Sequence, residues 1–160
     1  MLDTELQLIA LSVQLPQAIT VGSIYLHPTE QIQTDDFSPF LQLNSQPKIL
    51  FGDFNAHNPI WGGSKFNTRG RQIEYLVSTE NLSILHPQEE THFSFPHQSW
   101  STLDLILLSS SLLSEIQVFG HPDLAGSDHR PILLRRPIVT PQSDSRQLHT
   151  PSYRKTNWDK

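Results

Sequence analysis

Short apolar runs separated by turn residues follow one another along most of the chain, and this spacing limits the folds that it can form. Runs of about four to eight apolar or alternating residues are typical of β-strands. We expect strands at residues 6–15, 19–26, 48–51, 82–85, 91–95, 101–108, 115–119 and 131–134. Helices are expected only after Asp35 and over about residues 69–80, the second capped by Asn67 or Thr68. This order predicts a layered α/β or α+β domain in which sheet packs on sheet.

The composition limits the kinds of metal site and of nucleic-acid binding that the chain can have. The 160 residues include no cysteine, so disulfides and thiolate metal sites are excluded, and oxygen and nitrogen ligands favour Mg²⁺, Mn²⁺ or Ca²⁺. The net charge of −5 argues against a module that binds nucleic acid mainly by neutralising phosphates. It is compatible with a nuclease, because a bound metal supplies local positive charge. Acidic residues near the N-terminus and short apolar runs indicate neither a signal peptide nor a membrane span.

Polar residues stand at the ends of several expected strands. They are Tyr25, Asp53, Asn55, Asp128 and His129. Loops at strand ends on a rigid sheet often carry catalytic groups. Asp104 differs, because it lies inside the apolar run 101–108, where a carboxylate is costly to bury without a partner. A histidine is a suitable partner, since a carboxylate bound to one imidazole nitrogen leaves the other nitrogen for chemistry.

Each of these motifs, taken alone, also has a purely structural interpretation. GDFN and SDH can be turns, Tyr25 can be a core residue, and Asp104 can point outward from an edge strand. One mechanism needs the whole set, so their joint presence favours an active site. The remaining histidines show no metal-ligand spacing such as HExxH and are interpreted as surface or structural residues. They are His27, His57, His86, His92, His97, His121 and His149.

Four motifs in this order, IYLHP, GDFNAH, STLDLIL and SDHRPI, resemble the endonuclease/exonuclease/phosphatase superfamily. NAHNPIWGG, NTRG and THFSFP make the endonuclease domain of jockey-like non-LTR retrotransposons the most similar branch. The resemblance implies a four-layered α/β sandwich of two packed sheets flanked by helices. It also implies hydrolysis of DNA phosphodiesters with Mg²⁺ or Mn²⁺, in the nucleus, with no membrane partner. The chain itself carries no basic run typical of nuclear localisation.

The resemblance assigns catalytic roles to matching positions. Asp128 resembles a metal-associated carboxylate beside the catalytic His129, and Asp104 resembles the carboxylate that orients His129. Asp53 resembles the residue that positions or deprotonates the attacking water, and it is a second expected metal ligand.

Other matching positions imply contacts to the substrate. Asn55 and Tyr25 resemble catalytic groups that hold the phosphate. Thr91 and Ser127 resemble secondary hydrogen-bonding residues near the DNA strand. We expect all the catalytic residues to converge on one cleft at the ends of strands from both sheets.

The family pattern opens with an N-terminal half that supplies an Asn and a metal-binding Glu, and neither is found here. We therefore expect residues 1–136 to be a partial domain, the C-terminal half to two-thirds, with an apolar sheet face or an open sheet edge exposed. Residues 137–160, which contain YRKTNWDK, are expected to be a linker toward a missing reverse transcriptase, packing outside the core from about residue 141. The missing half of the domain and this polymerase are expected partners.

The expected function is an endonuclease that nicks target DNA for reverse transcription, with weak or no activity in this chain alone. Two alternatives stay open. One is another phosphodiesterase or phosphatase of the same superfamily, acting on phosphoinositides or sphingomyelin. The other is a catalytically dead retroelement remnant. The shared GDFN and SDH motifs do not separate these possibilities.

Overall fold

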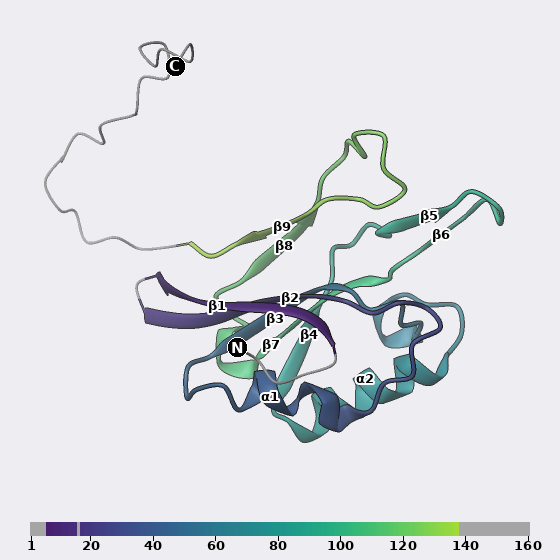
Figure 1. Ribbon diagram of the computed structural model, residues 1–160. Coiled ribbons are helices and arrows are strands. Elements are labelled where there is room, and N and C mark those ends of the chain that lie inside the picture. Colours follow the sequence, from purple (N-terminus) through teal and green to yellow (C-terminus); the bar gives the residue numbers. More distant parts are fainter. Residues whose placement is uncertain (1–5, 16, 138–160) are drawn as a thin grey trace, which may run out of the picture.

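A five-stranded mixed sheet forms the centre of the fold, with strand order β1-β2-β3-β7-β4 (Figure 1). The computed structural model describes residues 6–15 and 17–137. The strands are β1 (Gln7–Leu15), β2 (Gln17–Tyr25), β3 (Lys48–Asp53), β7 (Asp104–Ser109) and β4 (Leu82–Leu85). β2 and β3 are parallel, and the other neighbouring pairs are antiparallel. Because β2 and β3 run the same way, both end at the same edge of the sheet.

Two hairpins accompany this sheet. β5 (His92–Ser94) pairs with β6 (Ser99–Ser101), and β8 (Gln117–Gly120) pairs with β9 (Ile132–Arg135). A single antiparallel bridge between His92 and His129 links the two hairpins. The described residues thus form one principal sheet with two hairpins, and not two large sheets.

Helices cover the face of the sheet that lies opposite β8 and β9 (Figure 1). They are η1 (Thr34–Phe37), α1 (Ser38–Leu41) and α2 (Thr68–Thr79). The chain also forms short helical turns at η2 (Pro59–Trp61) and η3 (Ser110–Leu112), and Leu112 of η3 packs on the β8–β9 side of the sheet. The predicted cap of α2 is confirmed as Asn67, whose side chain accepts a hydrogen bond from Gly70 N at 2.7 Å. No helix among residues 6–15 and 17–137 is long and apolar enough to cross a membrane.

The predicted strand 101–108 is wrong at its start. The segment divides into β6 and β7, and residues 102–103 lie between them. Hydrogen bonds to distant residues cause this break: Leu103 O accepts from Phe54 N at 3.0 Å, and Thr91 Oγ1 accepts from Leu103 N at 3.0 Å. Asp104 is therefore the first residue of a strand and does not lie inside one.

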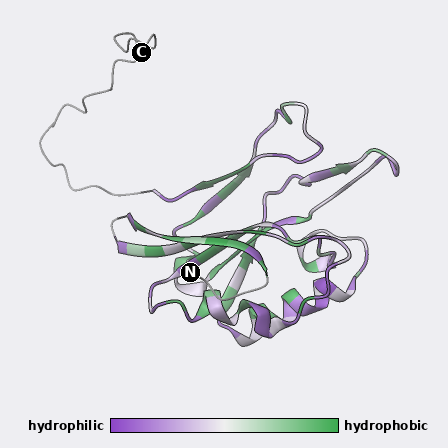
Figure 2. Cartoon of the chain, viewed as in Figure 1, coloured by the Kyte–Doolittle hydropathy of each residue, from purple (hydrophilic) through white to green (hydrophobic). Residues whose placement is uncertain are grey.

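Apolar residues pack on both faces of the sheet, because alternate strand residues point to opposite sides. On the helical side, Leu50 and Leu105 pack with Phe40 of α1 and Ile73 of α2. On the other side, a second cluster joins the sheet to the β8–β9 hairpin. Its members include Ile49, Ile106, Leu108, Ile132 and Leu134. Figure 2 shows the hydrophobic residues concentrated along the strands.

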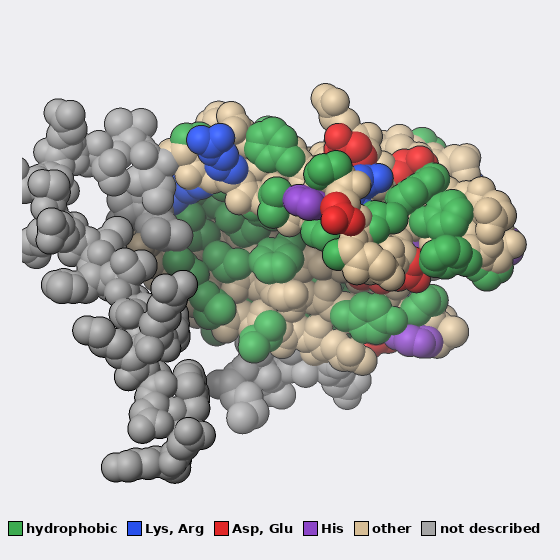
Figure 3. All heavy atoms as spheres, turned by 90° about the horizontal axis from the view of Figure 1, so that it is seen from above, with side chains coloured by type: hydrophobic (Ala, Val, Ile, Leu, Met, Phe, Trp, Pro, Cys, Tyr) green, Lys and Arg blue, Asp and Glu red, His purple; other side chains and the backbone are tan. Residues whose placement is uncertain are grey.

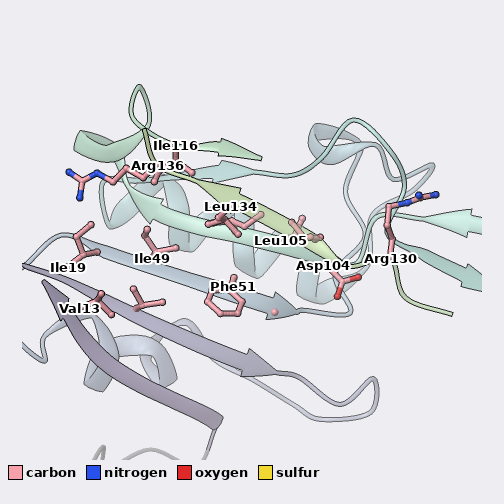
Figure 4. A pocket seen from close by; sticks show the side chains of 14 residues that line it. Val13, Ile19, Ile49, Phe51, Asp104, Leu105, Ile116, Arg130, Leu134 and Arg136 are labelled. Atoms are coloured by element: carbon pink, nitrogen blue, oxygen red, sulfur yellow. The ribbon is translucent and has the colours of Figure 1, made fainter. Parts of the chain in front are cut away.

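The β8–β9 hairpin covers only part of this second face. Ile9 is 69% exposed and Leu11 is 54% exposed, and the register places Leu11 opposite Val21, which in turn lies beside Ile49. A cavity of about 650 Å³ lies between sheet and hairpin, with Val13, Ile19, Phe51 and Leu134 among its lining (Figure 4). Figure 3 looks onto this side and shows hydrophobic side chains in the hollow.

The expected exposed apolar face is therefore present. The predicted linker, residues 137–160, lies outside the described residues apart from Pro137.

Candidate active site

Three polar side chains stand in one row at the edge where β2 and β3 end. The register pairs Tyr25 with Asp53 across β2 and β3, and it pairs Asp53 with Asp104 across β3 and β7. Paired residues of neighbouring strands point to the same face. The sheet alone thus places a phenol and two carboxylates side by side.

Gly52 makes this row possible. Its φ is 152°, and an added Cβ would lie 1.8 Å from the carbonyl oxygen of Ile24 on the neighbouring strand. Any side chain at this position would push β3 away from β2. The Gly-Asp sequence after the apolar run therefore brings Asp53 close to Tyr25.

Asp53 is held by Asn55. Asn55 N donates to Asp53 Oδ1 at 2.9 Å, and Asn55 Nδ2 donates to Asp53 Oδ2 at 2.9 Å and to Leu26 O at 3.0 Å. Both hydrogens of this amide are thereby engaged within the protein. In this arrangement Asn55 ties Asp53 to the segment after β2, and the phosphate contact that the resemblance implies for Asn55 stays a prediction.

His129 and Asp104 form the expected pair. His129 Nδ1 lies 2.9 Å from Asp104 Oδ2, a hydrogen bond that fixes the ring and leaves Nε2 for a substrate. Ser127 Oγ accepts from His129 N at 3.0 Å and so shapes the turn that presents the ring. Thr91 is fully buried, and its hydroxyl accepts from Asp104 N at 3.1 Å. Thr91 thus supports the backbone of Asp104.

His92 is part of this site, although sequence reasoning interpreted it as surface or structural. Its ring centroid lies 4.7 Å from that of His129, and its Nε2 lies 4.0 Å from Asp128 Oδ2. Asp128 has a half-exposed side chain, and its carbonyl oxygen accepts from Phe93 N at 2.8 Å. The available signal was the position of His92, directly after Thr91 and ahead of Asp104.

The structure therefore gathers Tyr25, Asp53, Asn55, Asp104, Asp128, His129 and His92 at one edge of the molecule. They come from the edge of the five-stranded sheet and the loop after β3, from β5 of the β5–β6 hairpin, and from the loop between β8 and β9. Figure 4 shows Asp104 at the end of the apolar cavity, so the polar site and the exposed apolar face adjoin.

The charge of Asp53 depends on its surroundings. Burial raises the pKa of this carboxyl above 3.8, and the nearby Asp104 carboxylate raises it further. The backbone hydrogen bond from Asn55 and the imidazoles of His129 and His92 lower the pKa and partly offset this rise. A carboxylate with a raised pKa is a better proton acceptor from water than an ordinary one.

The donor set does not by itself make a metal site. Residues 6–15 and 17–137 contain no group of three or more His, Asp or Glu side chains that could hold a metal ion. Both oxygens of Asp53 bind Asn55, and Asp104 binds His129. Asp53 and Asp128, the expected ligands, therefore fall short of a complete coordination sphere for Mg²⁺.

Comparison with known proteins shows the family to which the chain belongs. Residues 19–133 match the family model described as endonuclease-reverse transcriptase. The match covers more than half of the chain. An RNA-directed DNA polymerase from mobile element jockey of Drosophila melanogaster is 29% identical over 128 residues, covering 78% of this chain and 14% of the relative. A probable RNA-directed DNA polymerase from transposon X-element of the same species is 26% identical, covering 72% and 13%.

Solved structures share the fold. The endonuclease domain of TRAS1, a telomere-specific non-LTR retrotransposon, has a TM-score of 0.67 at 20% identity, covering 82% of this chain and 62% of that one. An endonuclease/exonuclease/phosphatase family protein from Leptotrichia buccalis has a TM-score of 0.60 at 18% identity, covering 81% and 52%. The mixed α/β fold thus spans about half to two-thirds of these domains. The chain belongs to the endonuclease-reverse transcriptase family of the endonuclease/exonuclease/phosphatase superfamily, and its relatives are jockey-like non-LTR retrotransposons.

Proposed function

We propose that this chain carries part of the catalytic site of a DNA endonuclease that nicks target DNA for reverse transcription. The observation that carries the proposal is the 2.9 Å contact between His129 Nδ1 and Asp104 Oδ2 beside the Asp53 carboxylate. A paired imidazole and a second carboxylate with a raised pKa are the acid and base that hydrolysis of a phosphodiester requires. The mobile-element polymerases named above support DNA as the substrate.

The chemistry of the described residues follows from their positions. Asp53 accepts a proton from, or aligns, the water that attacks phosphorus. His129, held by Asp104, presents Nε2 to the phosphate, where a positive imidazole stabilises charge or protonates the leaving oxygen. Tyr25 is half exposed beside Asp53, so its hydroxyl can hold a phosphate oxygen.

Metal dependence, with Mg²⁺ or Mn²⁺, is part of the proposal. Its remaining ligands would come from outside residues 6–15 and 17–137, because those residues hold no complete donor set. The apolar face beside Asp104 is where a further part of the fold would pack, since sheets in such domains bury one face against another layer. We also propose that residues 137–160 lead toward a reverse transcriptase.

The test is nicking of supercoiled plasmid DNA in Mg²⁺. We expect little or no nicking by residues 1–160 alone, because metal positioning supplies much of the barrier lowering. Adding the remaining part of the endonuclease domain, fused or as a separate chain, should restore nicking. His129→Ala and Asp53→Ala should then abolish it, while His121→Ala, an exposed histidine outside the site, should not.

Two results would redirect the interpretation. Strong nicking by residues 1–160 alone, abolished by His129→Ala, would show that the site needs no further ligands. A completed protein that binds DNA and never nicks it would favour a catalytically dead remnant, and the incomplete donor set is consistent with that outcome. Hydrolysis of phosphoinositides or sphingomyelin without nicking would favour another phosphodiesterase or phosphatase of the superfamily.

A further inference from the structure

We propose that Arg69, together with Asn67, is a positioning residue that fixes the two catalytic loops relative to each other. The inference rests on the proposed function for its catalytic consequence, and on geometry alone for the positioning itself. These residues belong to the NTRG segment at the start of α2, which makes none of the contacts described for His129 and Asp104.

Arg69 is a buried cation, only 6% exposed. Its guanidinium donates to four carbonyl oxygens: from Nη1 to Leu26 O and Phe54 O, both at 3.3 Å, and from Nη2 to His27 O at 2.9 Å and Glu30 O at 2.6 Å. Three of these carbonyls follow β2, and the fourth follows β3. Arg69 therefore joins the segment after Tyr25 to the segment after Asp53.

This bridging needs the shape of arginine. A guanidinium spreads five donor hydrogens over a rigid plane, whereas an ammonium group offers three from a single point. Burial lowers the pKa of Arg69, and the negative charges of Glu30 and Asp53 oppose that effect. Losing the guanidinium would leave several carbonyl oxygens without this donor, which is unfavourable for any of them that stays buried.

Asn67 acts on the same loop from the other side. Its Nδ2 donates to Asn55 O at 3.0 Å, and its Oδ1 accepts from His57 N at 3.0 Å. Asn55 has a φ of 47°, in the left-handed region that most residues avoid, so this peptide needs support from its neighbours. Gly70 completes the contact, since an added Cβ would lie 2.0 Å from His57 O.

Arg69 and Asn55 share one acceptor atom, and Asn67 holds Asn55 through its carbonyl oxygen. Leu26 O accepts from Arg69 Nη1 and also from Asn55 Nδ2, the amide that binds Asp53 Oδ2. A shift of Leu26 O would therefore be passed through Asn55 to Asp53. Because no atom of Arg69 or Asn67 lies in the row formed by Tyr25, Asp53 and Asp104, we expect them to affect the rate of the chemical step more than DNA binding.

The first test uses amide hydrogen exchange in the chain of residues 1–160. Asn55 N donates to Asp53 Oδ1 and Leu26 N donates to Asp53 O, so both amides report on the site. Arg69→Lys should raise the exchange rates of these two amides about tenfold or more, while the rates of amides in β7 stay nearly unchanged. The central strand β7 serves as the reference because its amides exchange mainly through global unfolding, whereas loop amides exchange through local opening. Arg71→Lys is the matched control, because Arg71 is exposed on the same helix over the Phe66 ring, and it should change neither amide.

A second variant distinguishes a local loss of positioning from a general loss of stability. Asn67→Asp keeps the acceptor for His57 N and Gly70 N and the helix cap, but it removes the donor to Asn55 O. It should loosen Asn55 while the melting temperature changes little. Equal acceleration of exchange throughout the chain, or the same local effect from Arg71→Lys, would overturn the proposal.

The effect of Arg69 on catalysis is measured separately, as kcat and KM for nicking by the completed endonuclease. Arg69→Lys should lower kcat by up to about 100-fold with little change in KM, since a misplacement of about 1 Å has effects of that size. An unchanged kcat despite loosened loops would refute the catalytic part. If the unsubstituted protein does not nick DNA, the proposed function fails, and hydrogen exchange still decides the positioning role.

Discussion

Replacing Trp61 with phenylalanine tests how much this buried side chain stabilises the segment after β3, because the change removes a hydrogen bond and part of a packed ring. Trp61 is fully buried, and its Nε1 donates to Ala56 O at 3.0 Å. Trp61→Phe leaves that carbonyl without its donor, at about 1–3 kcal/mol. The smaller ring also leaves a void larger than a methyl group, at about 1 kcal/mol. We expect a loss of about 2–4 kcal/mol in the free energy of unfolding, which is the sum of these two costs.

Trp100→Phe is the matched control. Trp100 is 36% exposed and contacts Phe93 and the guanidinium of Arg130, contacts that a phenylalanine ring can largely keep. Its loss should stay below about 1 kcal/mol. Urea denaturation followed by far-ultraviolet circular dichroism measures both variants without relying on tryptophan fluorescence. A Trp61→Phe loss no larger than that of Trp100→Phe would refute the reasoning.

Three further outcomes are expected. Asp104→Asn should lower kcat of the completed endonuclease by about 10²–10⁴, because the amide cannot stabilise a charged His129 ring, and steady-state nicking would reveal any retained rate. Because folding raises the pKa of Asp53, the protonated carboxyl stabilises the folded chain fully below pH 3.8, the unfolded pKa. This stabilisation is lost as the pH rises through the pKa of Asp53 in the folded chain. Asp53→Asn should therefore gain stability relative to the unsubstituted chain between about pH 3 and pH 7, and denaturation curves with a constant difference would contradict this. Ile9→Lys with Leu11→Lys should reduce self-association through the apolar face, with about 0.5 kcal/mol or less lost per site, as sedimentation velocity at increasing concentration would show.

Much of the fold could be predicted because local patterns and tertiary packing agree. The first two strands and the helix after Asn67 follow from residue types that have few alternatives. The pairing of Asp104 with His129 was implied by the family resemblance, since the residues alone indicated only that Asp104 needs a histidine partner. The division between β6 and β7 could not be predicted in this way. It depends on hydrogen bonds from Leu103 to Thr91 and Phe54, which are far away in the sequence.

The same limit applies within the site. His92 was overlooked because its place directly after Thr91 is a weak signal, and its contact with the His129 ring forms only in the folded chain. The local bonding of Asn55 was also hidden, since nothing in GDFN shows that its amide turns back to Asp53 and Leu26. Residue type predicts chemistry, whereas the partner that uses each hydrogen bond is set by the assembled fold.

His129, one member of the His129–Asp104 pair, lies in the loop between β8 and β9, and among the described residues this hairpin is not hydrogen-bonded into the central sheet. Asp53 and Asp104 are joined by the backbone pairing of β3 and β7, whereas His129 reaches them from the loop between β8 and β9. That loop is held by one bridge to His92 and by hydrogen bonds such as Arg130 N to Thr91 O at 2.7 Å. Partial opening of such a unit requires less free energy than unfolding the central sheet. Mild warming should therefore reversibly abolish the proposed nicking activity of the completed endonuclease below its melting temperature, because His129 moves away from an otherwise intact sheet.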